Sequence, residues 1–223
     1  MATWVIARLT FREAARRKIL WAALILGVAF LALYGIGVYF IHREIQHSIS
    51  SQNLTAMRET FSFVLMAGLY VVNFLVVMMT VLTSVDTLAG EIASGTIQAV
   101  VTKPLRRYQV VLGKWLGFAA MLALYVALMG GGVVIVTYIL TGYSAPGVPR
   151  GLGLMVMEGL ALLSVCILGG TSLSTLANGV LAFGLYGLAF VGGWIEQIGS
   201  LLRNETAVNI GIVSSLLMPS EAM

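Results

Sequence analysis

Long runs without a charged residue constrain the fold of this chain more than any other feature. A helix needs about 20 mainly apolar residues to cross the ~30 Å hydrocarbon core of a bilayer, because each residue advances it by ~1.5 Å. Runs of at least this length occupy residues 19–41, 60–85, 115–149 and 159–195. The composition agrees, since 59% of the residues are hydrophobic and only 10% are charged. The sequence therefore predicts an all-α, polytopic membrane protein.

The two longest runs must each be divided. Residues 141–149 are rich in turn-forming side chains, which ends the third span near residue 140. The last run is too long for one span, and Ala177-Asn178-Gly179 is predicted to be the tight turn within it, because Asn and Gly tolerate positive φ. The prediction is one transmembrane domain, residues 1–223, with five spans at 19–41, 60–85, 115–140, 152–176 and 180–198. The tail, 199–223, is expected to face outward as an interfacial or re-entrant segment, since its uncharged part is too short to cross.

The basic residues predict the orientation, because Lys and Arg beside membrane spans collect on the cytoplasmic side. Nine of them lie before the first span or after the second, namely Arg8, Arg12, Arg16, Arg17, Lys18, Lys103, Arg106, Arg107 and Lys114. The other four are Arg43, Arg58, Arg150 and Arg203. The N-terminus and the 86–114 loop are therefore expected to be cytoplasmic. This distribution explains the net charge of +4 without a nucleic-acid partner.

The first eighteen residues are predicted to form an interfacial helix. They do not resemble a cleaved signal peptide, because no small-residue cleavage site follows the apolar run. Arg8, Arg12 and Arg16 share one helical stripe from which they can reach lipid phosphates, and Trp4 can anchor the helix at the membrane surface. The alternative is a flank whose charges only set the orientation of the first span.

The 86–114 loop is charged and interrupted by glycine, so it must face water or a partner and is the expected contact surface. Gly90 and Gly95 weaken any helix that continues from the second span. Pro104 suits the first turn of a new helix over residues 105–112, which continues into the third span. Gly113 and Gly117 form a small-residue pair that would allow another helix to pack closely there.

Three segments of this loop together resemble the signature of permease subunits of type-2 ABC transporters: Gly90 to Thr96, Lys103 to Arg107 and Val111 to Lys114. Residues 7–17 also resemble the opening helix of that family. The resemblance implies an inner-membrane exporter subunit that pairs with a second permease and with two cytoplasmic ATPase subunits, which bind the ATP and Mg. It also implies that the loop carries a coupling helix. The residues expected to face the ATPase are Gly90, Glu91, Ser94, Gly95 and Thr96, with Arg106 and Arg107 at the rim.

Glu91 is the residue of this loop with the most directional chemistry. A carboxylate at an interface needs a basic or amide partner to offset its desolvation. The alternative is that Glu91 caps its own short helix. The family usually has six spans, and residues 218–223 resemble the entry to further chain, so we expect a sixth span to be missing at the C-terminus.

The sequence contains no recognisable motif for catalysis or metal binding. Gly113-Lys114 lacks the upstream glycine of a phosphate-binding loop and is followed by Trp115. His42, His47 and Cys166 have no metal-ligand spacing, and the methionines lie in apolar runs where packing explains them. We therefore predict no metal site, no cofactor bound by this chain, and ATP hydrolysis in a separate subunit.

Asn73 and Glu158 are the candidates for a substrate path within the spans. Asn73 can form a hydrogen bond between helices. Glu158 would lie about 10 Å inside the membrane if its span began at Gly151, where it would mark a cavity or carry a proton, but at the interface if the span began at Gly159. A path so poor in charge favours a lipid-like, drug-like or other amphiphilic substrate. The alternative function is a membrane anchor or scaffold that moves no substrate.

Overall fold

The computed structural model describes residues 2–48, 54–93, 95 and 106–215 of the chain. In these residues every regular element is a helix: α1 (Ala2–Arg16), α2 (Lys18–Ser48), α3 (Leu54–Ser84), α4 (Asp86–Ala93), α6 (Arg107–Thr141), α7 (Val148–Gly169), α8 (Thr175–Leu201) and α9 (Glu205–Ser215). Five of them, α2, α3, α6, α7 and α8, are long and apolar enough to cross a membrane. The all-α, five-span prediction is confirmed.

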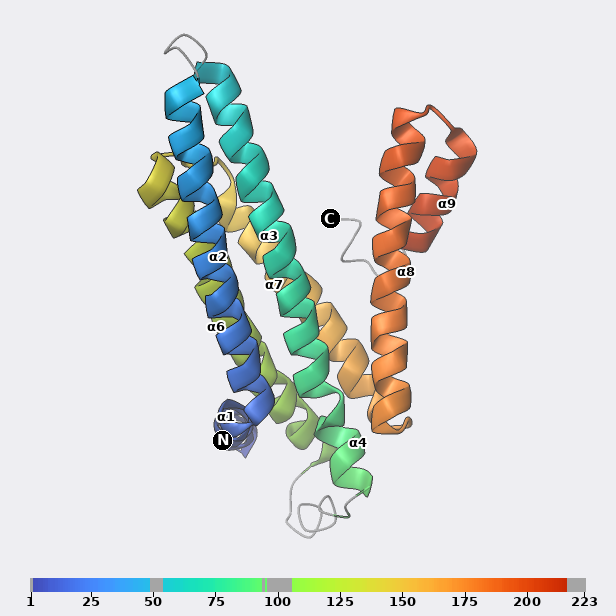
Figure 1. Ribbon diagram of the computed structural model, residues 1–223. Coiled ribbons are helices and arrows are strands. Elements are labelled where there is room, and N and C mark those ends of the chain that lie inside the picture. The colour runs from blue at the N-terminus through green and yellow to red at the C-terminus, as the bar shows by residue number, and fades with distance from the viewer. Residues whose placement is uncertain (1, 49–53, 94, 96–105, 216–223) are drawn as a thin grey trace.

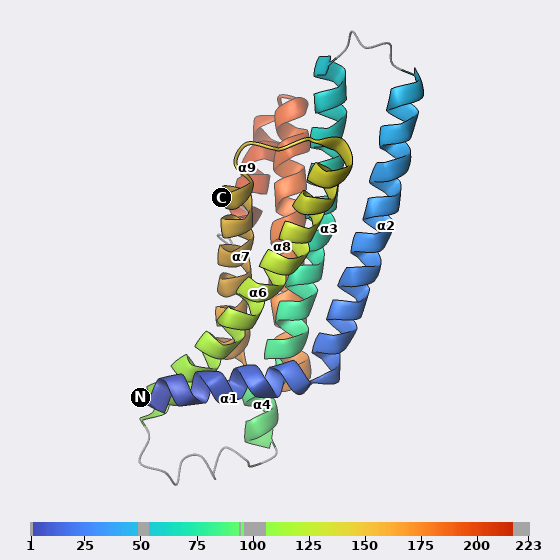
Figure 2. The same cartoon turned by 90° about the vertical axis from the view of Figure 1, so that its left-hand side faces the viewer.

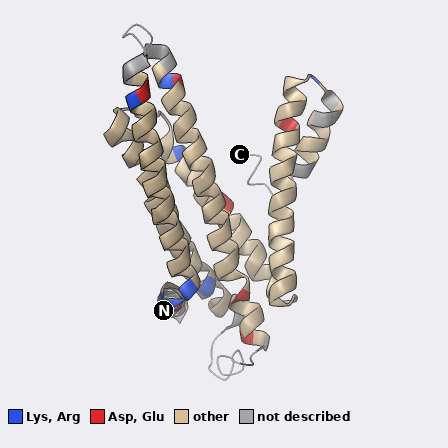
Figure 3. Cartoon of the chain, in the orientation of Figure 1, with Lys and Arg blue, Asp and Glu red and all other residues tan. Residues whose placement is uncertain are grey.

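The spans form a bundle with one divergent arm. α2, α3, α6 and α7 pack together, whereas α8 touches the bundle near its first residues and diverges from it toward its end, as Figure 1 shows. α1 lies across one end of the bundle, perpendicular to the spans, and α4 extends beyond α3 at the same end (Figure 2). Charged residues gather toward the two ends (Figure 3). We call the end with α1, α4 and the start of α6 the basic end, and the opposite one the far end.

Two apolar clusters hold these helices. The larger one joins α3, α6 and α7 through fully buried side chains such as Val72, Met79, Leu122 and Met129. The smaller one joins α3 and α7 to α8 through buried, mostly small residues such as Val81, Cys166 and Ala182. Small side chains permit close helix approach where the hydrophobic effect cannot drive association. The first half of α8 is therefore fixed to the bundle by packing.

α1 packs across the start of α6 on the Gly113 and Gly117 pair. A Cβ atom at Gly113 would lie 2.7 Å from the Cβ of Ile6, and one at Gly117 would lie 2.8 Å from the carbonyl oxygen of Ala7. Both glycines are needed for this contact, because the neighbours of each include a backbone carbonyl oxygen of α1, which cannot rotate away as a side chain can. The helix that the small-residue pair was expected to accommodate is α1.

The turn between the last two spans differs from the prediction. α7 ends at Gly169, short of residue 176, and α8 begins at Thr175, with Ser174 as its N-cap. Asn178 is not in a turn. It is buried in the first turn of α8 and donates hydrogen bonds to the carbonyl oxygens of Cys166 (2.8 Å) and Val85 (3.2 Å). The prediction at 177–179 was wrong because the amide of Asn178 satisfies carbonyl groups at two neighbouring helix ends.

The segment after α8 forms a short helix that returns along it. α9 contains 11 residues, or about 16 Å of helix, and packs against α8 at the far end (Figure 1). A Cβ atom at Gly211 would lie 2.6 Å from the backbone nitrogen of Glu196, so the two helices are in close contact. The reversal uses Arg203, which has φ 52°, and Asn204, whose side chain accepts a hydrogen bond from the Thr206 amide. The chain thus reverses its direction after α8 and packs back along it.

Candidate functional site

At the basic end, Asp86 joins three parts of the chain. It is the first residue of α4, and its carboxylate lies 3.9 Å from the guanidinium of Arg17, which joins α1 to α2. It also accepts a hydrogen bond of 3.0 Å from the hydroxyl of Thr175, which begins α8. Gly90, one turn later, leaves room for that carboxylate, since a Cβ there would lie 2.5 Å from Asp86 Oδ1. The start of α4 is thus tied to the junction of α1 and α2 and to the start of α8.

The other end of α4 is tied to α6 by Lys114. This lysine is only 7% exposed, and its ammonium forms an ion pair with the Glu91 carboxylate. It also donates a hydrogen bond of 3.3 Å to the carbonyl oxygen of Thr87. The buried ammonium therefore contacts two successive turns of α4. A movement of α4 must carry the start of α6 with it or break these bonds.

The residues predicted to face an ATPase have different surroundings. Glu91 is partly buried and points to Lys114, which supplies the basic partner from within the chain. Gly95 has φ 71° and open space around it, and Arg106 is exposed just before α6. Arg107 is the first residue of α6. Ser94, Thr96 and Pro104 lie outside the described residues.

The predicted membrane-surface residues lie on the outer side of α1. Trp4 is 75% exposed, and Arg8, Arg12 and Arg16 are exposed as well. The opposite side of α1 carries buried small residues such as Ala7 and Ala14, which face α6. The arginine stripe is thus turned away from the bundle, which is the arrangement expected of an interfacial helix.

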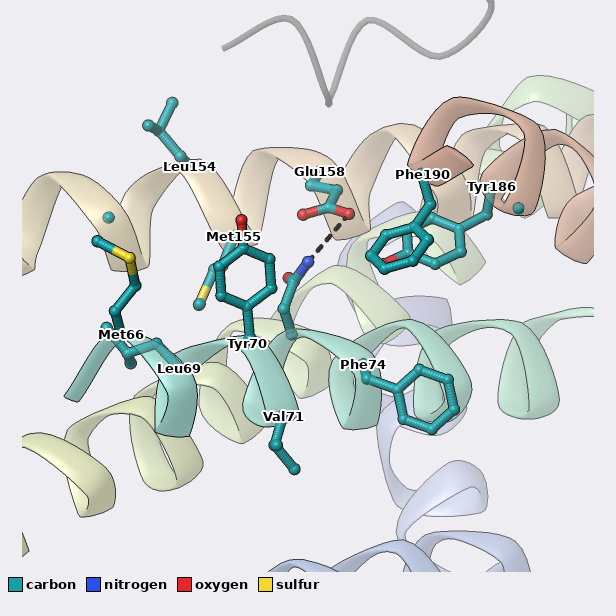
Figure 4. A pocket seen from close by; sticks show the side chains of 13 residues that line it. Met66, Leu69, Tyr70, Val71, Phe74, Leu154, Met155, Glu158, Tyr186 and Phe190 are labelled. Atoms are coloured by element: carbon teal, nitrogen blue, oxygen red, sulfur yellow. Dashed lines mark hydrogen bonds between the residues drawn. The ribbon is translucent and has the colours of Figure 1, made fainter. Parts of the chain in front are cut away.

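A cavity of about 690 Å³ lies between α3, α7 and α8. It brings together the two residues predicted for a substrate path: Asn73 Nδ2 donates a hydrogen bond of 3.3 Å to Glu158 Oε1 (dashed line in Figure 4). The remaining described lining is mostly apolar and aromatic: Met66, Leu69, Tyr70, Val71, Phe74, Gly151, Leu154, Met155, Tyr186, Gly187 and Phe190. A site of this size and composition suits a small amphiphilic molecule.

Glu158 lies halfway along α7, which does not begin at Gly159 as the interface alternative assumed. α7 begins at Val148 and has 22 residues, which places Glu158 about 15 Å from its first residue. The early start is possible because Gly147 adopts φ 90° and Pro149 occupies the first turn, where a missing amide hydrogen costs nothing. Glu158 is 8% exposed and points toward α3. A buried acid at this depth is typical of a functional cavity.

Sequence reasoning does not reveal two ion pairs of this site, which join four charged residues. The sequence presents Lys114 as an orientation charge and as the end of a signature segment, and it predicts neither the Lys114–Glu91 pair nor the Arg17–Asp86 pair. The closely packed glycines on either side of Lys114 were the available sign that this turn of α6 is enclosed. Thr175, Tyr186 and Phe190 carried no signal that separates them from ordinary span residues.

Among the described residues, no group of three or more His, Cys, Asp or Glu side chains is arranged to hold a metal ion. Comparison with curated proteins finds no match to the chain. A protein family described as "ABC-2 family transporter protein" matches residues 4–217, nearly the whole sequence. With five helices that can span a membrane and this match, the chain belongs to the ABC-2 family of transporter proteins and is a multi-pass permease of an ABC transporter.

Proposed function

We propose that this permease exports lipid-like, drug-like or other amphiphilic molecules across the inner membrane, with its N-terminus in the cytoplasm. The observation that carries the proposal is the cavity between α3, α7 and α8. Its volume of about 690 Å³ falls within the range of roughly 300–1,000 Å³ that is usual for small-molecule sites. Its apolar walls suit a hydrocarbon body, and Asn73 with Glu158 supplies one polar position halfway along α7.

The energy would come from a separate ABC ATPase, which holds ATP and Mg and which family membership implies as a partner, often with a second permease copy or homologue. We place its docking surface on the 86–114 segment. Ile92, 47% exposed at the end of α4, and Arg106 provide accessible surface there. Glu91 and Asp86 act behind that surface, because their bonds pass a displacement of α4 on to α6, to the junction of α1 and α2, and to α8.

The test is reconstitution of the permease with its ATPase in liposomes that contain a fluorescent phospholipid analogue. The proposal expects ATP-dependent movement of the analogue between leaflets. Arg106→Glu should weaken ATPase association, whereas Arg150→Glu, an exposed arginine at the far end, should not. Stable association without ATP-dependent movement of any amphiphile tested would favour the anchor or scaffold alternative. Equal association in the two arginine variants would exclude this docking surface.

A further inference from the structure

One polar atom at the cavity, the amide oxygen of Asn73, is unsatisfied among the described residues. Asn73 uses its amide NH₂ to donate to Glu158, and among the described residues its amide oxygen is buried without a hydrogen-bond partner. An unpaired buried acceptor costs roughly 1–3 kcal/mol, so such groups usually receive a donor. The oxygen belongs to a residue that lines the cavity. A molecule bound there with an N–H or O–H group can provide the missing donor.

The negative charge of Glu158 determines which kind of ligand can supply that donor. Glu158 is the only acidic or basic side chain among the described residues that line the cavity. A carboxylate in apolar surroundings is unfavourable unless a cation or several donors accompany it. A ligand cation stabilises that charge, a neutral ligand does not, and an anionic ligand is repelled. A cation with N–H groups can pair with Glu158 and donate to Asn73 at the same time.

Aromatic side chains beside the carboxyl group favour the same ligand. The rings of Tyr186 and Phe190 stack with centroids 6.2 Å apart, and Figure 4 shows them next to Glu158 on the α8 side of the cavity. Tyr70 and Phe74 of α3 also line the cavity. Aromatic faces attract ammonium groups by cation–π interaction, most strongly where water is excluded. Carboxylate and aromatic rings together are a recognition site for an amine.

From these contacts we infer that the substrates of this permease are cationic amphiphiles, with a protonated amine paired to Glu158, an N–H donated to Asn73 Oδ1, and a hydrocarbon body against the apolar walls. The inference rests on the proposed export function and specifies its substrate class. It also assigns the two side chains separate roles. Glu158 selects positive charge, and Asn73 selects an N–H group over a fully alkylated nitrogen.

The test compares four probes with one twelve-carbon chain and different head groups: dodecylammonium, dodecyltrimethylammonium, dodecanol and dodecanoate. Equilibrium binding of each radiolabelled probe is measured on the permease–ATPase complex in lipid nanodiscs, with binding to empty nanodiscs subtracted. Dodecylammonium should bind at least about tenfold more tightly than dodecanol, and dodecanoate should bind most weakly. Equal affinity for dodecylammonium and dodecanol in the wild type overturns the inference, and this comparison requires no variant to fold.

Variants then assign the preference to residues. Glu158→Gln should remove the tenfold advantage of dodecylammonium over dodecanol and leave dodecanol binding within about twofold. Glu196→Gln, which changes a carboxyl group on α8 outside the cavity lining, should leave all four affinities unchanged. Asn73→Leu should weaken dodecylammonium more than dodecyltrimethylammonium, because only the former has an N–H to donate. A cation preference that survives Glu158→Gln contradicts the assignment.

Failure of this inference differs from failure of the proposed function. If the complex moves dodecanol or a neutral lipid analogue with ATP but shows no cation preference, export stands and the substrate class is wrong. If the complex binds cations at Glu158 but moves no amphiphile, the export function fails and the binding site remains. ATP-dependent movement and head-group preference are therefore measured on the same preparation.

Discussion

Lys114 and Glu91 form an ion pair that fastens α4 to α6, although 23 residues of sequence separate them. The ammonium is almost completely buried, whereas the carboxylate remains partly exposed at the surface of α4. Removing one member of a buried pair leaves the other charge without compensation, so such pairs are sensitive to single substitutions. This pair connects the proposed docking surface to α6, a helix long enough to cross the membrane.

The first prediction concerns this pair. Lys114→Met and Glu91→Gln should each lower substrate-stimulated ATPase activity, and the double variant should lose less than the sum of the two. The expected coupling energy for contacting residues is about 0.5–3 kcal/mol, measured by a double-mutant cycle on thermal unfolding of the complex. If the changes in unfolding free energy of the two single substitutions simply added in the double variant, the ion pair would not be what connects α4 to α6.

A second prediction follows from the close contact of α1 with α6. Gly117→Ala should destabilise the protein by about 1–3 kcal/mol, because its new Cβ would lie 2.8 Å from a backbone oxygen and α1 would have to move. Gly131→Ala, in the same helix, meets nothing within 4 Å and should be neutral or stabilising, since Ala favours helix by up to ~1 kcal/mol. Thermal unfolding in nanodiscs compares them. Equal melting temperatures would contradict the tight α1–α6 contact.

Much of the fold could be predicted from the sequence because membrane spans must be long and apolar. The uncharged runs, with the turn-forming residues between them, predicted five spans because hydrocarbon disfavours charge, although α7 also carries Glu158 halfway along it. The boundary between the last two spans could not be predicted in this way. Asn178, followed by Gly179, is typical of a turn in sequence. Its hydrogen bonds to the carbonyl oxygens of Val85 and Cys166 instead place it inside a helix. Such bonds depend on which helix ends become neighbours.

The candidate sites show the same limit. Asn73 and Glu158 were selected singly as polar residues in apolar spans, and the structure pairs them across one cavity. Their pairing depends on how α3 and α7 pack, which no local pattern records. Glu91 was expected to find its basic partner on another protein, whereas Lys114 of the same chain supplies it. Sequence reasoning identified polar and charged residues whose burial costs free energy. The packing of the helices then determines which partners offset that cost.

Asn178 provides the third prediction. Asn178→Leu should remove two hydrogen bonds and leave two carbonyl groups without this donor, at a cost of about 1–3 kcal/mol. Because α8 is attached to the bundle mainly near its start, hydrogen exchange of its first turns should accelerate. Asn209→Leu, an exposed asparagine of α9, should leave exchange in that region unchanged. Unaltered protection of α8 in Asn178→Leu would show that apolar packing alone holds it.

The last prediction tests the orientation of the chain. The described basic residues of the N-terminal segment and of the 106–114 stretch lie at one end of the bundle, which the positive-inside rule assigns to the cytoplasm. In a Cys166→Ala background, Ser144→Cys on the far-end loop should react with a membrane-impermeant maleimide in intact cells. Arg12→Cys on α1 should react only after permeabilisation. The unmodified chain is the control, because its free cysteine, Cys166, is buried and should stay unlabelled. The reverse labelling pattern would put α1, α4 and the proposed docking surface outside, where no ATPase that hydrolyses cytoplasmic ATP could reach them.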